Sequence, residues 1–177
     1  MTFEVRTTST SDSNGGGFKS TASGSDYSQQ DNAEATLTDL VIGNPTTTQL
    51  SSATRPFVAA DVGNLFNITS GTGFTVGRYE AISVAAGVAT MDRSVGTAGS
   101  TGGSGRLGGA LLSIQTALTT MTVAGHTAFV KAGSGYTLST VQLSTTTNGA
   151  SNAPMKLIGY TTTRTDGGQV TITAGNT

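Results

Sequence analysis

A glycine-rich segment in the middle of the chain has the spacing of a nucleotide-binding loop. Gly103, Gly105 and Gly108 fit the G-x-G-x-x-G pattern, in which a tight strand-to-helix turn brings backbone N–H groups to a pyrophosphate. A dinucleotide site also uses an acidic residue roughly 20 positions further on, which binds the ribose hydroxyls. No acid occurs between Asp92 and Asp166. We therefore interpret the glycines as linker sequence and predict no nucleotide cofactor.

The scarcity of acids after Asp92 also argues against sugar-cleaving chemistry. Glycosidases and lyases need carboxylates that donate or accept a proton, and residues 93–165 contain none. His126 is the only histidine, and no nucleophile elbow lies near it in the sequence. We interpret His126 as a histidine of a turn or strand edge, and we predict no catalytic residue and no enzyme activity.

The N-terminal part of the chain contains oxygen-bearing side chains that could bind a calcium ion. They are Asp12, Ser13, Asn14, Asp26 and Asp31, and three glycines follow Asn14. Their spacing does not match that of a calcium-binding loop. Because the chain contains no cysteine, a thiolate metal site is excluded as well. We predict solvated side chains here and no bound metal.

The composition favours an all-β protein with few charges. Only 11% of the 177 residues are charged and 25 are glycine, while serine and threonine occur in nearly every segment, which suits strand faces and turns better than helices. The formal net charge of -1 gives no field that would attract nucleic acid. No apolar run is long enough for a transmembrane helix. We expect neither nucleic acid nor a membrane as a partner.

The few charges are unevenly distributed along the chain. Residues 1–92 contain nine acids and four bases, which gives -5, and residues 93–177 contain one acid and five bases, which gives +4. Two interpretations are open. The two halves pack against each other within one chain, or opposite patches steer docking between subunits.

The order of apolar and turn-forming segments divides the chain into four parts. Residues 1–35 form an extended docking arm, because they contain too few large apolar side chains to bury themselves. Residues 36–95 form a small antiparallel β module, a meander or barrel, in which residues 85–87 are short enough for a hairpin turn. Residues 96–110 form a flexible linker of Gly, Ser and Thr. Residues 111–177 form a short helix followed by strands.

Residues 26–31, 57–65, 77–82 and 88–94 resemble a small module near the N-terminus of structural proteins of tailed bacteriophages. In those proteins the module is commonly followed by a right-handed parallel β-helix of the pectate-lyase-like superfamily. Residues 113–118, 126–133 and 153–160 are similar to the first coils of that β-helix. The resemblance implies that residues 111–177 contain these first coils and that the short helix caps them.

The resemblance implies a non-enzymatic virion protein on the exterior of the particle, either a capsid decoration or cement protein or the anchoring region of a tail fibre or spike. A solenoid needs about three stacked coils to bury its apolar faces, so we expect a homo-oligomer, preferably a trimer, that contacts other virion proteins. Two alternatives stay open: an N-terminal fragment of a glycan-active β-helix depolymerase, and a bacterial surface protein. The candidate docking or oligomer residues are apolar anchors of the arm and two later tyrosines: Phe3, Val5, Phe18, Tyr27, Tyr136 and Tyr160.

The C-terminal strands contain five apolar residues that are candidates for the interior of a β-helix. Phe129 and Val130 are adjacent, so in a regular strand their side chains face opposite sides. One of them must therefore cover the short helix or a neighbouring subunit. The other three candidates are Leu157, Ile158 and Ile172.

Overall fold

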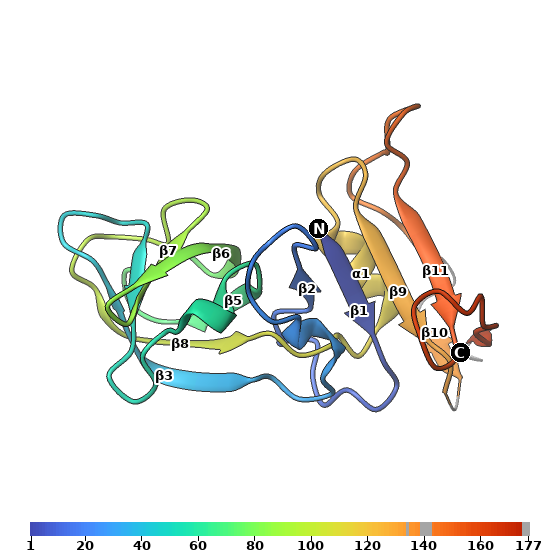
Figure 1. Ribbon diagram of the computed structural model, residues 1–177, viewed down its shortest axis with the longest axis horizontal. Helices are drawn as coiled ribbons and strands as arrows, with labels where there is room; N and C mark the ends of the chain where they lie inside the picture. The colour runs from blue at the N-terminus through green and yellow to red at the C-terminus, as the bar shows by residue number, and fades with distance from the viewer. Residues whose placement is uncertain (134, 139–142, 175–177) are drawn as a thin grey trace.

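The computed structural model describes residues 1–133, 135–138 and 143–174. A closed barrel lies at one end of the long axis and a small parallel sheet at the other, with the N-terminus between them (Figure 1). The described chain is mostly β, and its one α-helix, α1 (Ile114–Thr120), is short. Both features agree with the sequence-based prediction. Two single-turn 3-10 helices also occur, η1 (Tyr27–Gln29) and η2 (Ala59–Asp61).

The barrel consists of six antiparallel strands in the order β3-β4-β7-β6-β5-β8. Alternate side chains of these strands fill its interior, as in other small barrels. The ring of Phe57, which follows β4, meets the ring of Phe66 of β5 edge to face, with 5.8 Å between the ring centroids. The strands are β3 (Ala35–Ile42), β4 (Gln49–Ser51), β5 (Leu65–Ser70), β6 (Gly77–Ala85), β7 (Val88–Met91) and β8 (Thr101–Leu107).

The predicted flexible linker is wrong for residues 101–107, which form β8 and close the barrel against β3 and β5. Its glycines provide room for aromatic rings. A β-carbon on Gly103 would overlap the ring of Phe74, and one on Gly105 would overlap the ring of Phe66. Composition alone does not distinguish a glycine that gives flexibility from one against which a ring packs.

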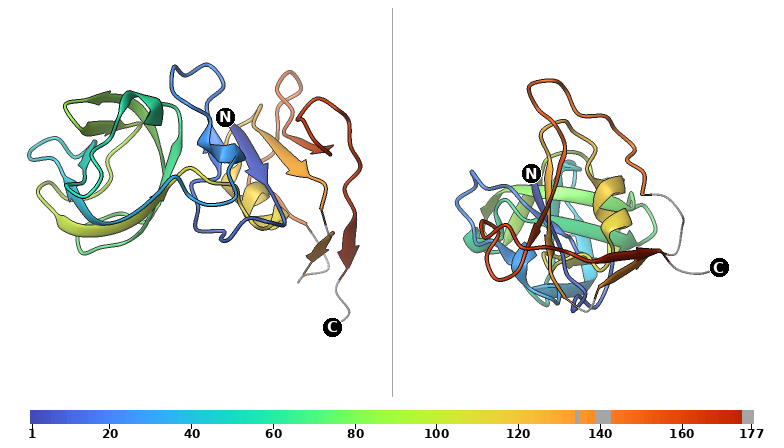
Figure 2. Two further views of the ribbon diagram at one scale, coloured as in Figure 1. Left: turned by 60° about the horizontal axis from the view of Figure 1, so that its bottom comes forward. Right: turned by 90° about the vertical axis from the view of Figure 1, so that its right-hand side faces the viewer.

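Four strands form the sheet at the other end, in the order β11-β9-β1-β2. They are β1 (Thr2–Val5), β2 (Gly17–Phe18), β9 (Thr127–Lys131) and β11 (Lys156–Tyr160). β9 pairs in parallel with both β1 and β11, whereas β2 is antiparallel to β1. A second parallel pair, β10 (Tyr136–Leu138) and β12 (Ile172–Ala174), lies on the side away from the barrel (Figure 2).

A second apolar core lies between this sheet and α1. Ser113 caps the helix, because its hydroxyl accepts a hydrogen bond from Thr116 N at 3.2 Å. Val130 points into this core and is buried, whereas Phe129 lies on the opposite face of the sheet. The core also contains Phe3, Val5, Leu65, Leu111, Ile114, Ala117, Leu118, Met121, Ala128 and Tyr136.

The predicted extended arm of residues 1–35 is instead part of the folded body. Gly15 N donates to Gly108 O at 2.8 Å. A β-carbon on Gly15 would overlap the carbonyl oxygen of Leu65, so this approach requires glycine. The side chain of Asn14 is fully buried and donates to Ala110 O at 2.8 Å. The prediction failed because it counted only large apolar side chains as anchors, and backbone contacts hold this segment.

Candidate functional site

Five of the six residues predicted to form a docking surface are buried within the chain. Phe3, Val5 and Tyr136 belong to the second core, and Phe18 and Tyr160 are buried as well. These five side chains have too little exposed surface to contact a partner, so the structure corrects the expectation for them. Tyr27 is partly buried against the barrel core, and its docking role stays a prediction.

Tyr136 and Tyr160 bond to groups near the N-terminus. The hydroxyl of Tyr136 lies 2.7 Å from Lys131 O and 3.2 Å from Val5 O. Burial raises the pKa of Tyr136 to about 12. The hydroxyl of Tyr160 donates to Glu4 Oε1, and burial together with this hydrogen bond raises the pKa of Tyr160 above its usual value. Both phenols therefore remain protonated at neutral pH and tie the later strands to β1.

A cluster of charges surrounds Glu4 on the face of the sheet opposite α1. The Glu4 side chain is fully buried. Arg6 Nε donates to its Oε1 at 3.0 Å, and Arg164 Nε donates to its Oε2 at 2.8 Å. Two cations and one phenol thus satisfy a buried carboxylate, as a buried charge requires. We call Glu4, Arg6, Tyr160 and Arg164 the Glu4 cluster.

Arg164 extends the Glu4 cluster to residues near η1. Its Nη1 lies 2.8 Å from Asp26 Oδ2, and its Nη2 donates to Ser28 Oγ at 2.9 Å. The guanidinium also lies over the ring of Phe129, 5.1 Å from the ring centroid. Phe129 therefore covers the cluster, a role that was not expected. Val130 packs in the core beside α1, which agrees with the expectation that one of the two residues covers the short helix.

The loop that carries Arg164 is shaped by Asp166. This carboxylate accepts backbone N–H groups from Thr162 at 2.6 Å, from Thr161 at 2.9 Å and from Thr163 and Gly168 at 3.0 Å. These backbone hydrogen bonds hold the pKa of Asp166 well below its usual value. Asp166 thus orders the loop and lets Arg164 reach Glu4 and Asp26.

The Glu4 cluster joins the acidic and basic parts of the sequence. Arg164 comes from the basic half, and its partners Glu4 and Asp26 come from the acidic half. For these charges the two halves pack together within one chain, which was one of the two open interpretations. Docking between subunits through opposite charges stays a prediction.

Sequence reasoning missed the Glu4 cluster. Glu4 alternates with Phe3 and Val5 in β1, so its position indicated an outward, solvated side chain. The signal for its burial is Arg164, which comes 160 positions later and has no motif around it. Only the three-dimensional pairing of β1, β9 and β11 brings the two residues to the same face.

The outer edge of β11 is the exposed apolar part of the parallel sheet. β11 is the last strand of the sheet (Figure 1), and within the described ranges no strand pairs with its second edge. Leu157 of β11 is 42% exposed and Ile172 of β12 is 41% exposed. They line an apolar cavity of about 210 Å³ together with Ile114, Val130 and Val170. β1 pairs with β9 along one edge and with the short strand β2 along its other edge. The free edge of β11 therefore lies at the end of the sheet away from β2.

His126 occupies the strand edge that was predicted for it. It directly precedes β9, its backbone oxygen accepts Lys156 N at 3.0 Å, and its ring lies 5.4 Å from that of Phe3. Burial, and then the nearby N-terminal amine, lower the pKa of His126. Its Nδ1 is buried without a hydrogen-bond partner among the described residues.

The part of the chain that the structure describes contains neither a metal-ligand cluster nor a membrane-spanning helix. No three side chains of His, Cys, Asp or Glu come together there as a metal site would need. No helix there combines the length and apolar character required to cross a membrane.

Comparison with known proteins gives no assignment. The chain matches no family model, no curated protein and no solved structure.

Proposed function

We propose that the chain is a non-enzymatic structural protein of a tailed-bacteriophage particle and that it acts on the exterior of the virion. The resemblance of the barrel segments, residues 57–65, 77–82 and 88–94, supports the phage assignment. Within this proposal the protein is a capsid decoration or cement protein, or it anchors a tail fibre or spike. Its contribution is adhesion between parts of the particle.

The strand pairing supports the proposal that the C-terminal part begins a right-handed parallel β-helix. β9 and β10 are consecutive strands, and so are β11 and β12. β11 stacks in parallel on β9, and β12 stacks in parallel on β10. Each pair of consecutive strands therefore contributes one strand to each of two sheets, as successive coils of a solenoid do.

The observation that carries the proposed assembly role is the free apolar edge of β11. An exposed edge offers unpaired backbone groups to another chain, and soluble monomers usually protect such edges with charge or proline. β11 contains one charged residue, Lys156, and an exposed Leu157. We propose that this edge is covered in a homo-oligomer, preferably a trimer about an axis.

Light scattering coupled to size exclusion tests the oligomer. We expect the wild-type chain to have the mass of a trimer at micromolar concentration, and Leu157→Asp to have the mass of a monomer because it places a charge in the interface. Val76→Asp is the matched control, since Val76 is also exposed but lies between barrel strands. A folded, monodisperse wild-type monomer would refute the proposed assembly.

Particle composition tests the virion assignment separately. We expect antibodies against the chain to label purified phage particles in electron micrographs, at the capsid or at the tail. If the culture produces the protein but the purified particles do not contain it, the protein is not a virion component. Release of oligosaccharides from a polysaccharide by the purified chain would instead favour the depolymerase alternative.

A further inference from the structure

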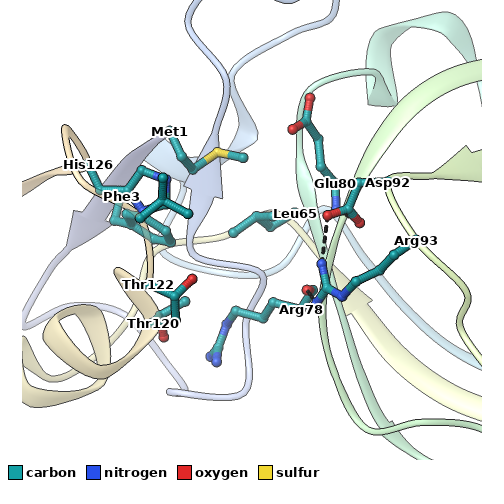
Figure 3. Close-up of a pocket in the computed structure, with 11 residues that line it drawn as sticks. Met1, Phe3, Leu65, Arg78, Glu80, Asp92, Arg93, Thr120, Thr122 and His126 are labelled. Carbon is teal, nitrogen blue, oxygen red and sulfur yellow. Dashed lines mark hydrogen bonds and ion pairs between the residues drawn. The ribbon is translucent and has the colours of Figure 1, made fainter. Parts of the chain in front are cut away.

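A cleft lies where the barrel meets the second core. Its volume is about 280 Å³, and a neighbouring hollow of about 220 Å³ shares its arginines and threonines. One wall comes from β6 and the residues after β7, and the other from β1 and the segment after α1 (Figure 3). Charged and apolar side chains both line it: Arg78, Glu80, Asp92 and Arg93, and Met1, Phe3, Leu65 and Val123.

The two carboxylates of the cleft already have cationic partners. Lys19 Nζ lies 3.1 Å from Glu80 Oε1, and Arg93 Nη1 lies 2.6 Å from Asp92 Oδ2. Asp92 also accepts the backbone N–H of Glu80 at 3.0 Å. Their charges are therefore balanced, but each carboxylate keeps acceptor capacity, because an ionised carboxylate has about four lone-pair sites.

Arg78 carries a charge that no carboxylate balances by direct contact. Its guanidinium donates to the backbone oxygens of Asp12 at 2.5 Å, Asn14 at 3.1 Å and Gly15 at 3.0 Å. Within the described ranges it forms no ion pair, and the carboxylate of Asp12 instead accepts two backbone N–H groups at the start of the α1 segment. Burial lowers the pKa of Arg78, and Asp12 opposes this shift only from a distance. A partly buried cation without a carboxylate partner favours an anionic ligand.

Two polar atoms of the cleft, Nη1 of Arg78 and the hydroxyl oxygen of the exposed Thr122, have no hydrogen-bond partner among the described residues. The guanidinium of Arg78 extends across the cleft toward Thr120 and Thr122 (Figure 3). A guanidinium edge beside a hydroxyl is well suited to an oxyanion.

We propose that the cleft binds a small hydroxylated monoanion, a sugar acid. Arg78 and Thr122 bind its carboxylate, Glu80 and Asp92 accept hydrogen bonds from its hydroxyls, and the wall of Met1 and the exposed Val123 contacts its C–H face. Arg78 supplies one positive charge that no carboxylate pairs with, which matches a monoanion and leaves the second charge of a phosphate dianion without a cation. A volume of about 280 Å³ is at the lower limit of the roughly 300–1,000 Å³ of ligand sites, so one sugar ring fits. This proposal is independent of the virion assignment.

Titration of the full-length chain with glucuronate, followed by amide chemical shifts, tests the proposal. We expect saturable shifts around Arg78, Glu80 and Thr122, which weaken as salt is added because the charges are screened. Glucose lacks the carboxylate and inorganic phosphate is partly a dianion. Each should bind at least about tenfold more weakly, the scale of one lost charge-assisted hydrogen bond.

Two variants and a control separate binding from folding. Arg78→Gln should weaken glucuronate binding about tenfold or more. Arg106→Gln is its control, because Arg106 also contacts Asn14, at 3.4 Å, but lies outside the cleft. If Arg78→Gln unfolds, Thr122→Val at an exposed position should still weaken binding several-fold. Absence of saturable shifts with glucuronate, phosphate binding as tight as glucuronate binding, or full affinity in both cleft variants would each overturn the proposal.

Discussion

Arg164 Nε lies 2.8 Å from Glu4 Oε2, although the two residues are 160 positions apart in the sequence. This contact fixes the loop after β11 to the first strand of the chain. Because Glu4 is fully buried, its charge depends on Arg6 and Arg164 for compensation. The Glu4 cluster therefore links the N-terminal strand to the C-terminal part of the chain.

Glu4→Gln should lower the free energy of unfolding by about 3 kcal/mol, because it removes the buried carboxylate that two largely buried guanidinium groups share and leaves them only Asp26 and Asp31 at the margin of the cluster. Urea denaturation followed by circular dichroism measures the change. Glu34→Gln is the control, since Glu34 is exposed, and it should change stability by less than about 0.5 kcal/mol. Equal effects of the two substitutions would mean that the Glu4 cluster does not stabilise the fold.

Gly103→Ala should destabilise the barrel, because the new β-carbon would overlap the ring of Phe74. All three of the nearest atoms belong to that ring. The cost should be about 1–3 kcal/mol, as for other overpacked sites. Phe74→Leu in the same chain should recover part of this loss, because it removes the ring. A thermodynamic cycle of the two single variants and the double variant measures the coupling. Strict additivity would contradict the packing role of Gly103.

Tyr136→Phe should flatten the loss of stability at alkaline pH. Burial raises the pKa of Tyr136 from 10 in the unfolded chain to about 12. Its contribution is therefore complete below pH 10 and is lost as the pH rises from 10 to 12, since the unfolded chain releases the proton first. Free energies of unfolding between pH 8 and 12 should fall less steeply in the variant. Identical slopes would show that the Tyr136 phenol does not stay protonated in the folded state.

Val130→Asp should unfold the second core, whereas Leu157→Asp should leave the chain folded. Val130 is 2% exposed and Leu157 is 42% exposed, so only the first substitution buries an unpaired charge, at a cost of several kcal/mol. Thermal unfolding of both variants measures the difference. Unfolding of Leu157→Asp would show that the fold of the chain depends on this side chain as it does on Val130.

The sequence predicted those parts of the fold that depend on local alternation. The barrel follows from the strand patterns around Leu37, Phe66 and Met91, and the short helix follows from the apolar spacing after Leu111. The predictions of a flexible linker and of an extended arm were wrong, because both inferred conformation from amino-acid composition. The glycines of residues 101–107 pack against aromatic rings, and those beside Asn14 allow backbone contact.

The candidate sites were less predictable than the fold. The docking residues were chosen because they are apolar, and apolar residues of a small chain are the ones its own core uses first. The free edge of β11 and the cleft at Arg78 depend on which strands pair and on where backbone carbonyls lie. Neither property is encoded within a few neighbouring residues.

The pairing of Thr2 with Thr127 places the whole barrel between two strands that are neighbours in one sheet. During synthesis on the ribosome, β1 emerges first, yet its parallel partner β9 is translated only after all six barrel strands. Because the barrel contains its own complete core, we expect it to fold while β1 still lacks β9. Completion of the parallel sheet is then a late, non-local step, which slows folding and leaves β1 exposed to other nascent chains in the meantime.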